Sequence, residues 1–303
     1  MERTRAHRPP SPVDLDLSLG TLVRGRGDPT SSRRSDGWWF AWHTPQGPTT
    51  LHLRPEGEQV AASAWGSGGD WMLDRLPDLL GARDDVSGFV PHHELVARAW
   101  PRYAAWRVPA TGLVAQSLVC SVLEQRVTGR EAFTSQRRLV RRFGEPAPGP
   151  GAALGLVCPP SSADWARIPS WEWLRAGVDA SRSRVVVTAL RSAGRLDECA
   201  GLPLEAARAR LRSLPGVGVW TTAEVTQRAL GDADSPSYGD YHVARNVTYN
   251  LTGEIGDDDA MAALLAPYAP HRYRAQRIIE GAGPGVPRRG PRRSLPTHLP
   301  TRW

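Results

Sequence analysis

The sequence predicts a mainly α-helical protein with a smaller N-terminal α+β domain built on an antiparallel sheet. Strand-like patterns are concentrated before about residue 94, and helical spacing of apolar residues dominates after it. A length of 303 residues with 40% hydrophobic content can supply a core to each of two domains. We therefore expect an N-terminal α+β domain at residues 13–93 and a helical domain at residues 94–280.

An antiparallel hairpin is the clearest feature of the predicted N-terminal domain. Residues 37–43 (GWWFAWH) and 49–53 (TTLHL) have strand-like composition, and residues 45–48 (PQGP) form a turn between them. Residues 14–17 (DLDL) alternate in the manner of a strand. Six tryptophans in the first hundred residues are interpreted as core rather than as base-stacking platforms: Trp38, Trp39, Trp42, Trp65, Trp71 and Trp100.

Apolar residues recur with helical spacing through the rest of the chain. A loop rich in Pro, Gly and Ala separates the second predicted helix from the third, at residues 144–160. The spacing predicts helices over residues 113–123, 131–143, 181–193, 203–211, 219–230, 241–251 and 260–280.

The two ends of the chain are polar and interrupted by proline, so we expect disordered tails at residues 1–12 and 281–303. These tails carry charges of +2 and +5, which account for the whole formal net charge of +7. The excess of positive charge is therefore located in the tails. A DNA-binding role for the rest of the chain must be argued from motifs. No run of apolar residues could span a membrane or form a signal peptide, so we expect a cytoplasmic protein.

The composition bears on cofactors and on covalent chemistry. Cys120, Cys158 and Cys199 are far apart and are expected to be buried free thiols. The histidines include one adjacent pair and no HExxH arrangement, so we expect no metal and no organic cofactor, although an inert ion held by backbone carbonyls is compatible with this. The chain contains no lysine, which excludes a Schiff base formed by a lysine side chain.

A short glycine motif is the sharpest signal in the sequence. Residues 214–218 (LPGVG) lie between two predicted helices, and two glycines one residue apart let backbone N–H groups face outward at a helix start. Such N–H groups can hold a phosphate oxygen without a charged side chain. An ordinary turn between helices would have the same five residues.

A second motif follows twenty residues after Trp220. Gly239-Asp240-Tyr241 places an acidic residue where a new helix begins. Asp240 fits a helix N-cap, and the dipoles there favour its ionised form, which is the form needed to stabilise a developing sugar cation. The capping and catalytic interpretations are compatible.

The two motifs together resemble the helix-hairpin-helix DNA glycosylase superfamily, and within it the DNA-3-methyladenine glycosylase II type. Residues 214–221 (LPGVGVWT) followed by residues 239–241 (GDY) carry the resemblance, which extends over about residues 13–280 through N-terminal segments at 27–30 (GDPT), 64–66 (AWG) and 79–81 (LLG). The resemblance implies a helical domain that clamps the DNA backbone through the hairpin and flips the damaged base out of the duplex.

The resemblance also implies roles for individual residues. Asp240 matches the catalytic aspartate, and Trp220 falls where bifunctional members place a lysine, so the enzyme would be a simple hydrolase that leaves an abasic site. Further residues implied in DNA binding are Leu214, Gly216, Gly218, Thr221 and Arg126, and those implied in the base pocket are Trp220, Gln125 and Glu224.

Two of these positions depart from the family pattern. Arg126 stands where the resemblance leads us to expect an apolar wedge residue, and a solvated arginine at a helix end fits equally well. Glu224 lies one helical turn after Trp220, where an aromatic is expected, and it would either attract a cationic purine or be a solvated glutamate.

The sequence as a whole therefore predicts a monofunctional, monomeric DNA glycosylase that excises alkylated purines of the 3-methyladenine type from double-stranded DNA in base excision repair. Two alternatives stay open: a non-catalytic helix-hairpin-helix DNA-binding protein, and a glycosylase for oxidised or deaminated bases.

Overall fold

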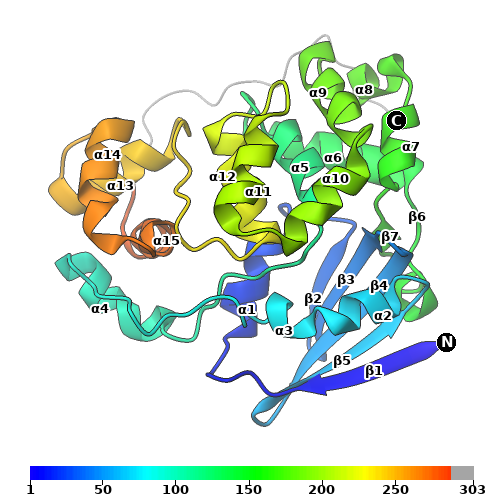
Figure 1. Cartoon of the computed structure of the whole chain (residues 1–303), viewed down its shortest axis with the longest axis horizontal. Helices are drawn as coiled ribbons and strands as arrows, with labels where there is room; N and C mark the ends of the chain where they lie inside the picture. The colour runs from blue at the N-terminus through cyan, green and yellow to red at the C-terminus, as the bar shows by residue number, and fades with distance from the viewer. Residues whose placement is uncertain (288–303) are drawn as a thin grey trace.

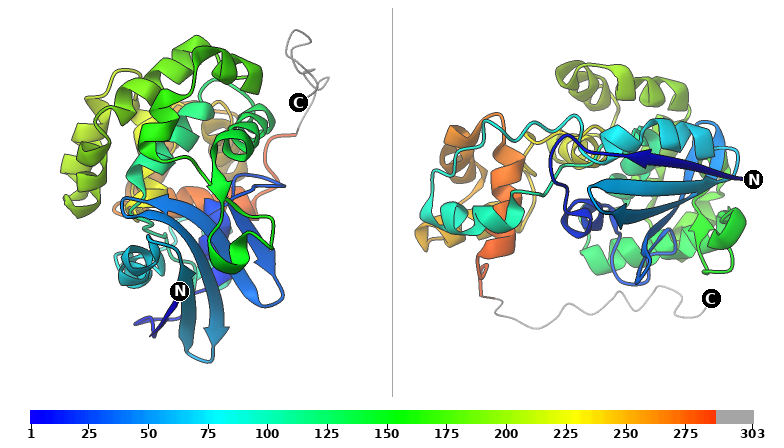
Figure 2. Two further views of the ribbon diagram at one scale, coloured as in Figure 1. Left: turned by 90° about the vertical axis from the view of Figure 1, so that its right-hand side faces the viewer. Right: turned by 90° about the horizontal axis from the view of Figure 1, so that it is seen from below.

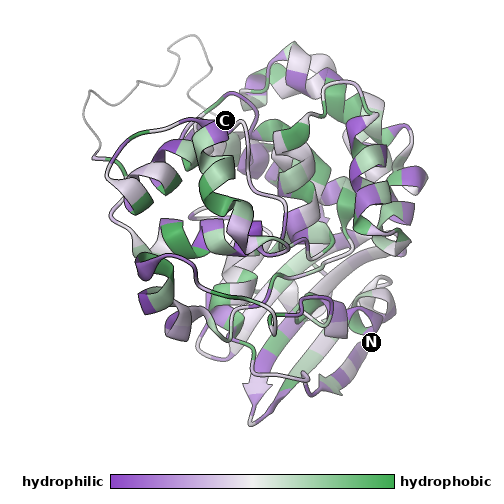
Figure 3. Cartoon of the chain, turned by 60° about the vertical axis from the view of Figure 1, so that its left-hand side comes forward, coloured by the Kyte–Doolittle hydropathy of each residue, from purple (hydrophilic) through white to green (hydrophobic). Residues whose placement is uncertain are grey.

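A computed structural model of the chain describes residues 1–287. It consists of an antiparallel sheet at one side and a larger helical part that lies beside and above the sheet (Figure 1). The predicted fold class is confirmed, and hydrophobic and hydrophilic residues alternate along the helix ribbons in Figure 3.

The sheet has five strands in the order β1-β5-β4-β3-β2, and every pairing is antiparallel. The predicted hairpin is confirmed as β3 and β4, which meet at Thr44 and Gly47. The strands are β1 (Glu2–His7), β2 (Ser31–Arg34), β3 (Gly37–Thr44), β4 (Gly47–Glu56) and β5 (Gln59–Trp65), and a separate two-stranded sheet is formed by β6 (Glu145–Pro146) and β7 (Val157–Cys158).

The first residues of the chain belong to the sheet, so the prediction of a disordered tail at 1–12 is wrong. Strand β1 pairs with β5 from Glu2 opposite Trp65 to His7 opposite Val60. This edge strand (ERTRAH) is almost entirely polar. It therefore lacks the alternation of apolar and polar residues that identifies a strand in a sequence. Backbone pairing, together with the Arg3 ion pair to Asp70, fixes it instead.

Both faces of β3 are buried. Trp38, Phe40 and Trp42 face a core closed by α1 (Leu15–Leu19), α2 (Gly69–Asp74) and α3 (Leu76–Leu79). Trp39 faces the other side and packs against residues of the 147–158 segment. The prediction that the six N-terminal tryptophans are packing residues is therefore confirmed, since Trp65, Trp71 and Trp100 also pack against core clusters.

Residues 14–17 are not a strand. Asp14 caps helix α1, and its carboxylate accepts a hydrogen bond of 2.9 Å from the Leu17 backbone N–H. A four-residue alternation is too short to distinguish a strand from one helical turn, and here the cap decides the outcome.

The larger helical core is built around α5, which is buried along its length. Helices α5 and α6 confirm the predicted helices at 113–123 and 131–143, and a capping box of Thr128 and Glu131 starts α6. The helices of this part are α5 (Val114–Leu123), α6 (Gly129–Phe143), α7 (Ser162–Arg167), α8 (Ser170–Ala176), α9 (Ala180–Leu190), α10 (Ala193–Asp197), α11 (Leu204–Arg212) and α12 (Val219–Ala229).

A second helical core joins distant parts of the chain. Helix α4 (Glu94–Tyr103) packs with α13 (Val243–Thr252), α14 (Asp258–Leu265) and α15 (Arg272–Ala282). In the right view of Figure 2 this group lies at the opposite end from the sheet. The single helix predicted over 260–280 is wrong, because Pro267 and Pro270 interrupt it between α14 and α15.

Residues 281–287 are ordered, which corrects this part of the predicted tail at 281–303. Helix α15 continues to Ala282, and the backbone N–H groups of Gly285 and Val286 donate to the side chains of Asn250 and Asn246. The remainder of that predicted tail, residues 288–303, lies outside the described residues.

Two further sequence expectations concern cysteines and membranes. All three cysteines are buried and free, as predicted. Within residues 1–287, no helix has the length and apolar character needed to cross a membrane.

Candidate active site and nucleic-acid interface

The predicted hairpin joins α11 to α12 through residues 213–218. Gly216 has a φ of 83°, and a Cβ there would come within 2.3 Å of a Val185 methyl group. Gly218 has an ordinary φ of −93°, and a Cβ there would meet nothing within 4 Å. In the described part of the chain no side chain caps α12, so its first N–H groups point outward from an exposed turn.

The other residues implied at this interface have mainly structural contacts. Gln125 Nε2 donates to the Gly216 carbonyl (3.0 Å) and to Thr221 Oγ1 (2.9 Å), so its amide ties α5 to the hairpin. Thr221 is buried, and Leu214 is half-buried against the larger helical core. Gln125 was expected to face the base pocket, but its amide N–H groups are already bound to the hairpin.

Asp240 lies three residues before the first residue of α13, whose N-cap is His242, so it is not the N-cap that its motif predicts; its carboxylate binds the turn that leads into the helix. Its Oδ1 accepts hydrogen bonds from the backbone N–H groups of His242 (2.7 Å) and Val243 (3.1 Å). Its Oδ2 accepts a bond of 3.2 Å from the Trp220 indole N–H. The carboxylate is therefore oriented by three donors while the residue stays partly exposed.

Trp220 and Asp240 are brought together across twenty residues of sequence. Trp220 is in the first turn of α12, directly after the hairpin, and its ring is half-buried. The hairpin, this indole and the Asp240 carboxylate thus form one continuous group in which a turn without a side-chain cap lies next to an oriented carboxylate.

Arg126 lies beside this group, in the turn after α5. Its side chain is exposed, and its φ of 57° is the only positive φ of a non-glycine residue among residues 1–287. A left-handed arginine is a strained conformation of the kind that occurs at functional sites. Its neighbour Gln125 holds the turn against the hairpin.

Glu224 is neither solvated nor open toward a base. Its carboxylate accepts 2.6 Å from Arg228 Nη1 and 2.7 Å from Ser237 Oγ, and the residue is 7% exposed. Burial alone would raise the pKa of Glu224, but Arg228 and the Ser237 hydroxyl hold that pKa below its usual value.

Helix α15 adds charged residues that the sequence analysis missed. Arg277 Nη1 lies 3.6 Å from Glu280 Oε2, and Gln276 Nε2 donates to the same oxygen at 3.2 Å. Burial, together with the nearby charges of Asp240 and Glu224, raises the pKa of Glu280 even though Arg277 opposes the shift. The signal in the sequence that could have identified these residues is an Arg and a Glu three residues apart on a largely buried helix.

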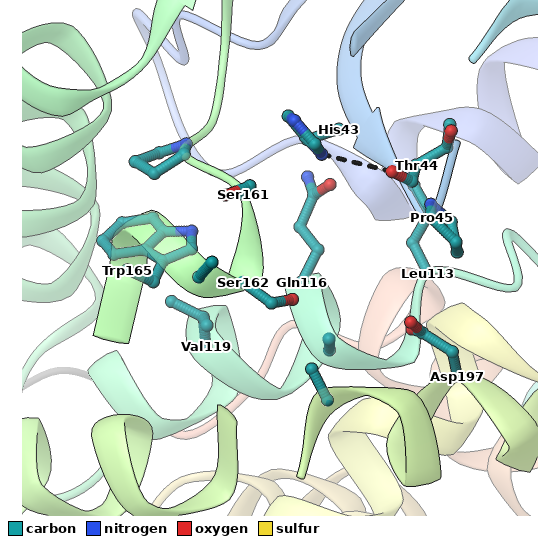
Figure 4. Close-up of a pocket in the computed structure, with 14 residues that line it drawn as sticks. His43, Thr44, Pro45, Leu113, Gln116, Val119, Ser161, Ser162, Trp165 and Asp197 are labelled. Carbon is teal, nitrogen blue, oxygen red and sulfur yellow. Dashed lines mark hydrogen bonds between the residues drawn. The ribbon is translucent and has the colours of Figure 1, made fainter. Parts of the chain in front are cut away.

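A cavity of about 240 Å³ lies elsewhere, between the sheet and the helices (Figure 4). His43 and Thr44 line it from the end of β3, Gln116 from α5 and Trp165 from α7. None of its lining residues belongs to α12 or to the turn that carries Asp240. In residues 1–287 no group of three or more His, Cys, Asp or Glu side chains is placed to hold a metal ion.

An antiparallel sheet beside a helical part that contains the hairpin is a fold shared with solved DNA glycosylases. Over 131 residues, or 43% of its length, the chain is 34% identical to the probable bifunctional transcriptional activator/DNA repair enzyme AlkA of Mycobacterium tuberculosis. That match spans 26% of the relative's length. The sequence similarity to AlkA is therefore limited to this segment.

Solved structures share the whole fold. The 3-methyladenine DNA-glycosylase from Archaeoglobus fulgidus aligns with a TM-score of 0.73 at 18% identity, covering 91% of this chain and 97% of that one. The 8-oxoguanine glycosylase/lyase of Clostridium acetobutylicum aligns with a TM-score of 0.69 at 9% identity, covering 93% and 98%. No protein-family model matches the chain.

Proposed function

We propose that this protein is a monofunctional DNA glycosylase that excises alkylated purines from double-stranded DNA in base excision repair. The observation that carries the proposal is the Asp240 carboxylate, which three hydrogen bonds orient next to Trp220 and the open hairpin. A protein that only bound DNA could use this carboxylate to hold the turn before α13, but it would not need the carboxylate to lie next to Trp220 and the open hairpin.

The chemistry follows from the charges at the site. An N3- or N7-alkylated purine is already cationic, so it leaves the sugar with little help from a general acid. The hairpin N–H groups would hold a phosphate, Trp220 would stack on the flipped base, and Asp240 would stabilise the oxocarbenium-like sugar and orient water. Arg126 would fill the space in the duplex that the flipped base leaves.

The absence of lysine supports hydrolysis over a lyase reaction, because no lysine side chain can attack the sugar. The reaction would leave an abasic site and require no metal or organic cofactor. We further propose that the protein acts as a monomer in the cytoplasm.

A second candidate, excision of an oxidised or deaminated base, is favoured by the fold shared with the 8-oxoguanine glycosylase/lyase. Base release from duplexes that contain 3-methyladenine, 7-methylguanine, hypoxanthine or 8-oxoguanine tests both candidates. We expect release of the methylated bases, and strand cleavage only after alkali. Release of 8-oxoguanine or hypoxanthine without release of the methylated bases would establish the second candidate, and no release from any duplex would contradict both.

A further inference from the structure

The buried Glu224 carboxylate is connected to the turn that carries Asp240. Glu224 Oε1 accepts a 2.7 Å hydrogen bond from Ser237 Oγ, and the Ser237 carbonyl accepts a 3.2 Å bond from the Asp240 backbone N–H. Ser237 is 3% exposed, so the protein interior supplies its hydrogen-bonding partners.

Helix α15 holds the same serine from the other side. Gln276 Oε1 accepts a 2.8 Å bond from the Ser237 backbone N–H, and Gln276 is 2% exposed. Ser237 is thus fixed by a carboxylate from α12 and by an amide from α15. These two helices belong to different hydrophobic cores, so the turn is held from both.

We propose that Glu224 is a positioning residue, which fixes Ser237 and thereby the turn that presents the Asp240 carboxylate. The inference rests on the proposed function only in taking Asp240 as the group that acts on the sugar. It replaces the base-contact role that the sequence suggested for Glu224.

The direction of each hydrogen bond supports this role. The carboxylate of Glu224 can only accept, so the Ser237 hydroxyl must donate to it, and the hydroxyl oxygen is left to accept from Gln227 Nε2 (3.3 Å) and Gln276 Nε2 (3.4 Å). Arg228 donates to the other oxygen of Glu224. A neutral amide at position 224 cannot accept from both partners through separate oxygens, since its NH₂ group must face Arg228 or Ser237.

Single-turnover base release by the full chain tests the proposal. Glu224→Gln and Ser237→Ala should each slow release by roughly 10- to 100-fold, as a displaced catalytic group does. The fold-change should be equal on methylated and neutral lesions, and affinity for a duplex with an abasic-site analogue should stay within about twofold. Ser237→Thr, which keeps the hydroxyl, should recover most of the rate.

Glu172→Gln is the matched control. Glu172 is also buried, and its carboxylate lies 2.7 Å from Arg142 Nη2, but it belongs to α8 and has no link to the Asp240 turn. This variant should keep the parent rate even if it melts earlier. An unchanged rate in Glu224→Gln, or a loss confined to methylated lesions, would overturn the positioning role.

Hydrogen exchange separates this inference from the proposed function, because it needs no enzymatic activity. Exchange at residues 237–243 should rise in Glu224→Gln and Ser237→Ala and stay unchanged in Glu172→Gln. Unchanged exchange in the first two variants would end the inference whatever the activity. A parent that releases no base, but shows this exchange pattern, would refute the proposed function and leave the structural link standing.

Discussion

The helices α12 and α13 begin in opposite ways. Helix α12 starts at exposed glycines, and no side chain within the described residues caps it. At the start of α13, the carboxylate of Asp240 accepts hydrogen bonds from His242 and Val243. Both helix starts have backbone N–H groups without a partner in the helix and the positive end of the helix dipole. Of the two, only the start of α13 has a carboxylate, that of Asp240, bound to these groups.

This difference indicates that the two helix starts have different roles. The open end of α12 can accept an anion from outside, such as a DNA phosphate, whereas α13 holds an internal anion that can face a cation. Trp220 joins them, since it lies in the first turn of α12 and donates to Asp240. In the proposed function, the phosphate and the sugar cation would therefore bind at adjacent places.

A carboxylate introduced at the start of α12 should make this helix start resemble that of α13. Gly218→Asp fits sterically, because the position has an ordinary φ and open space around its Cβ. An Asp there would cap α12 and repel phosphate, so we expect a 10- to 100-fold loss of affinity, or about 1.4–2.8 kcal/mol, on every DNA sequence. Fluorescence anisotropy with undamaged and abasic duplexes measures it, and unchanged affinity would mean that phosphate binds elsewhere.

The two hairpin glycines should respond differently to alanine. Gly218→Ala should fold normally and weaken binding about threefold or less, since the N–H groups remain. Gly216→Ala forces a positive φ on alanine and a clash with Val185, so we expect a loss of roughly 1–3 kcal/mol in the free energy of unfolding. Denaturant unfolding of both variants checks this, and equal stabilities would contradict the described hairpin.

The hydrogen bonds that Asp240 accepts just before α13 predict a smaller effect on stability. Asp240→Ala removes the acceptor for His242 and Val243 and should cost about 1 kcal/mol, whereas Asp240→Asn keeps an acceptor oxygen and should cost less. Thermal unfolding of the two variants compares them. A larger loss of stability for Asp240→Asn than for Asp240→Ala would argue against a stabilising role of these hydrogen bonds.

Local motifs in the sequence predicted both helix starts. The glycines of the hairpin and the spacing of Asp240 from Trp220 predicted the positions that the structure brings together. The role of Glu224 was not predictable, because Ser237 and Gln276 are 39 residues apart and meet only through packing of α15. Strand β1 was missed for a related reason, since its pairing with β5 and not its polar sequence determines its place.

The central claim is that the Asp240 carboxylate acts on the sugar. Single-turnover release of 7-methylguanine from a duplex by the parent and by Asp240→Asn tests it most directly, with binding to an abasic-analogue duplex measured in parallel. The account predicts a rate at least about 10²–10³-fold lower in Asp240→Asn, with affinity within about twofold of the parent. A near-normal rate of release by Asp240→Asn would contradict it.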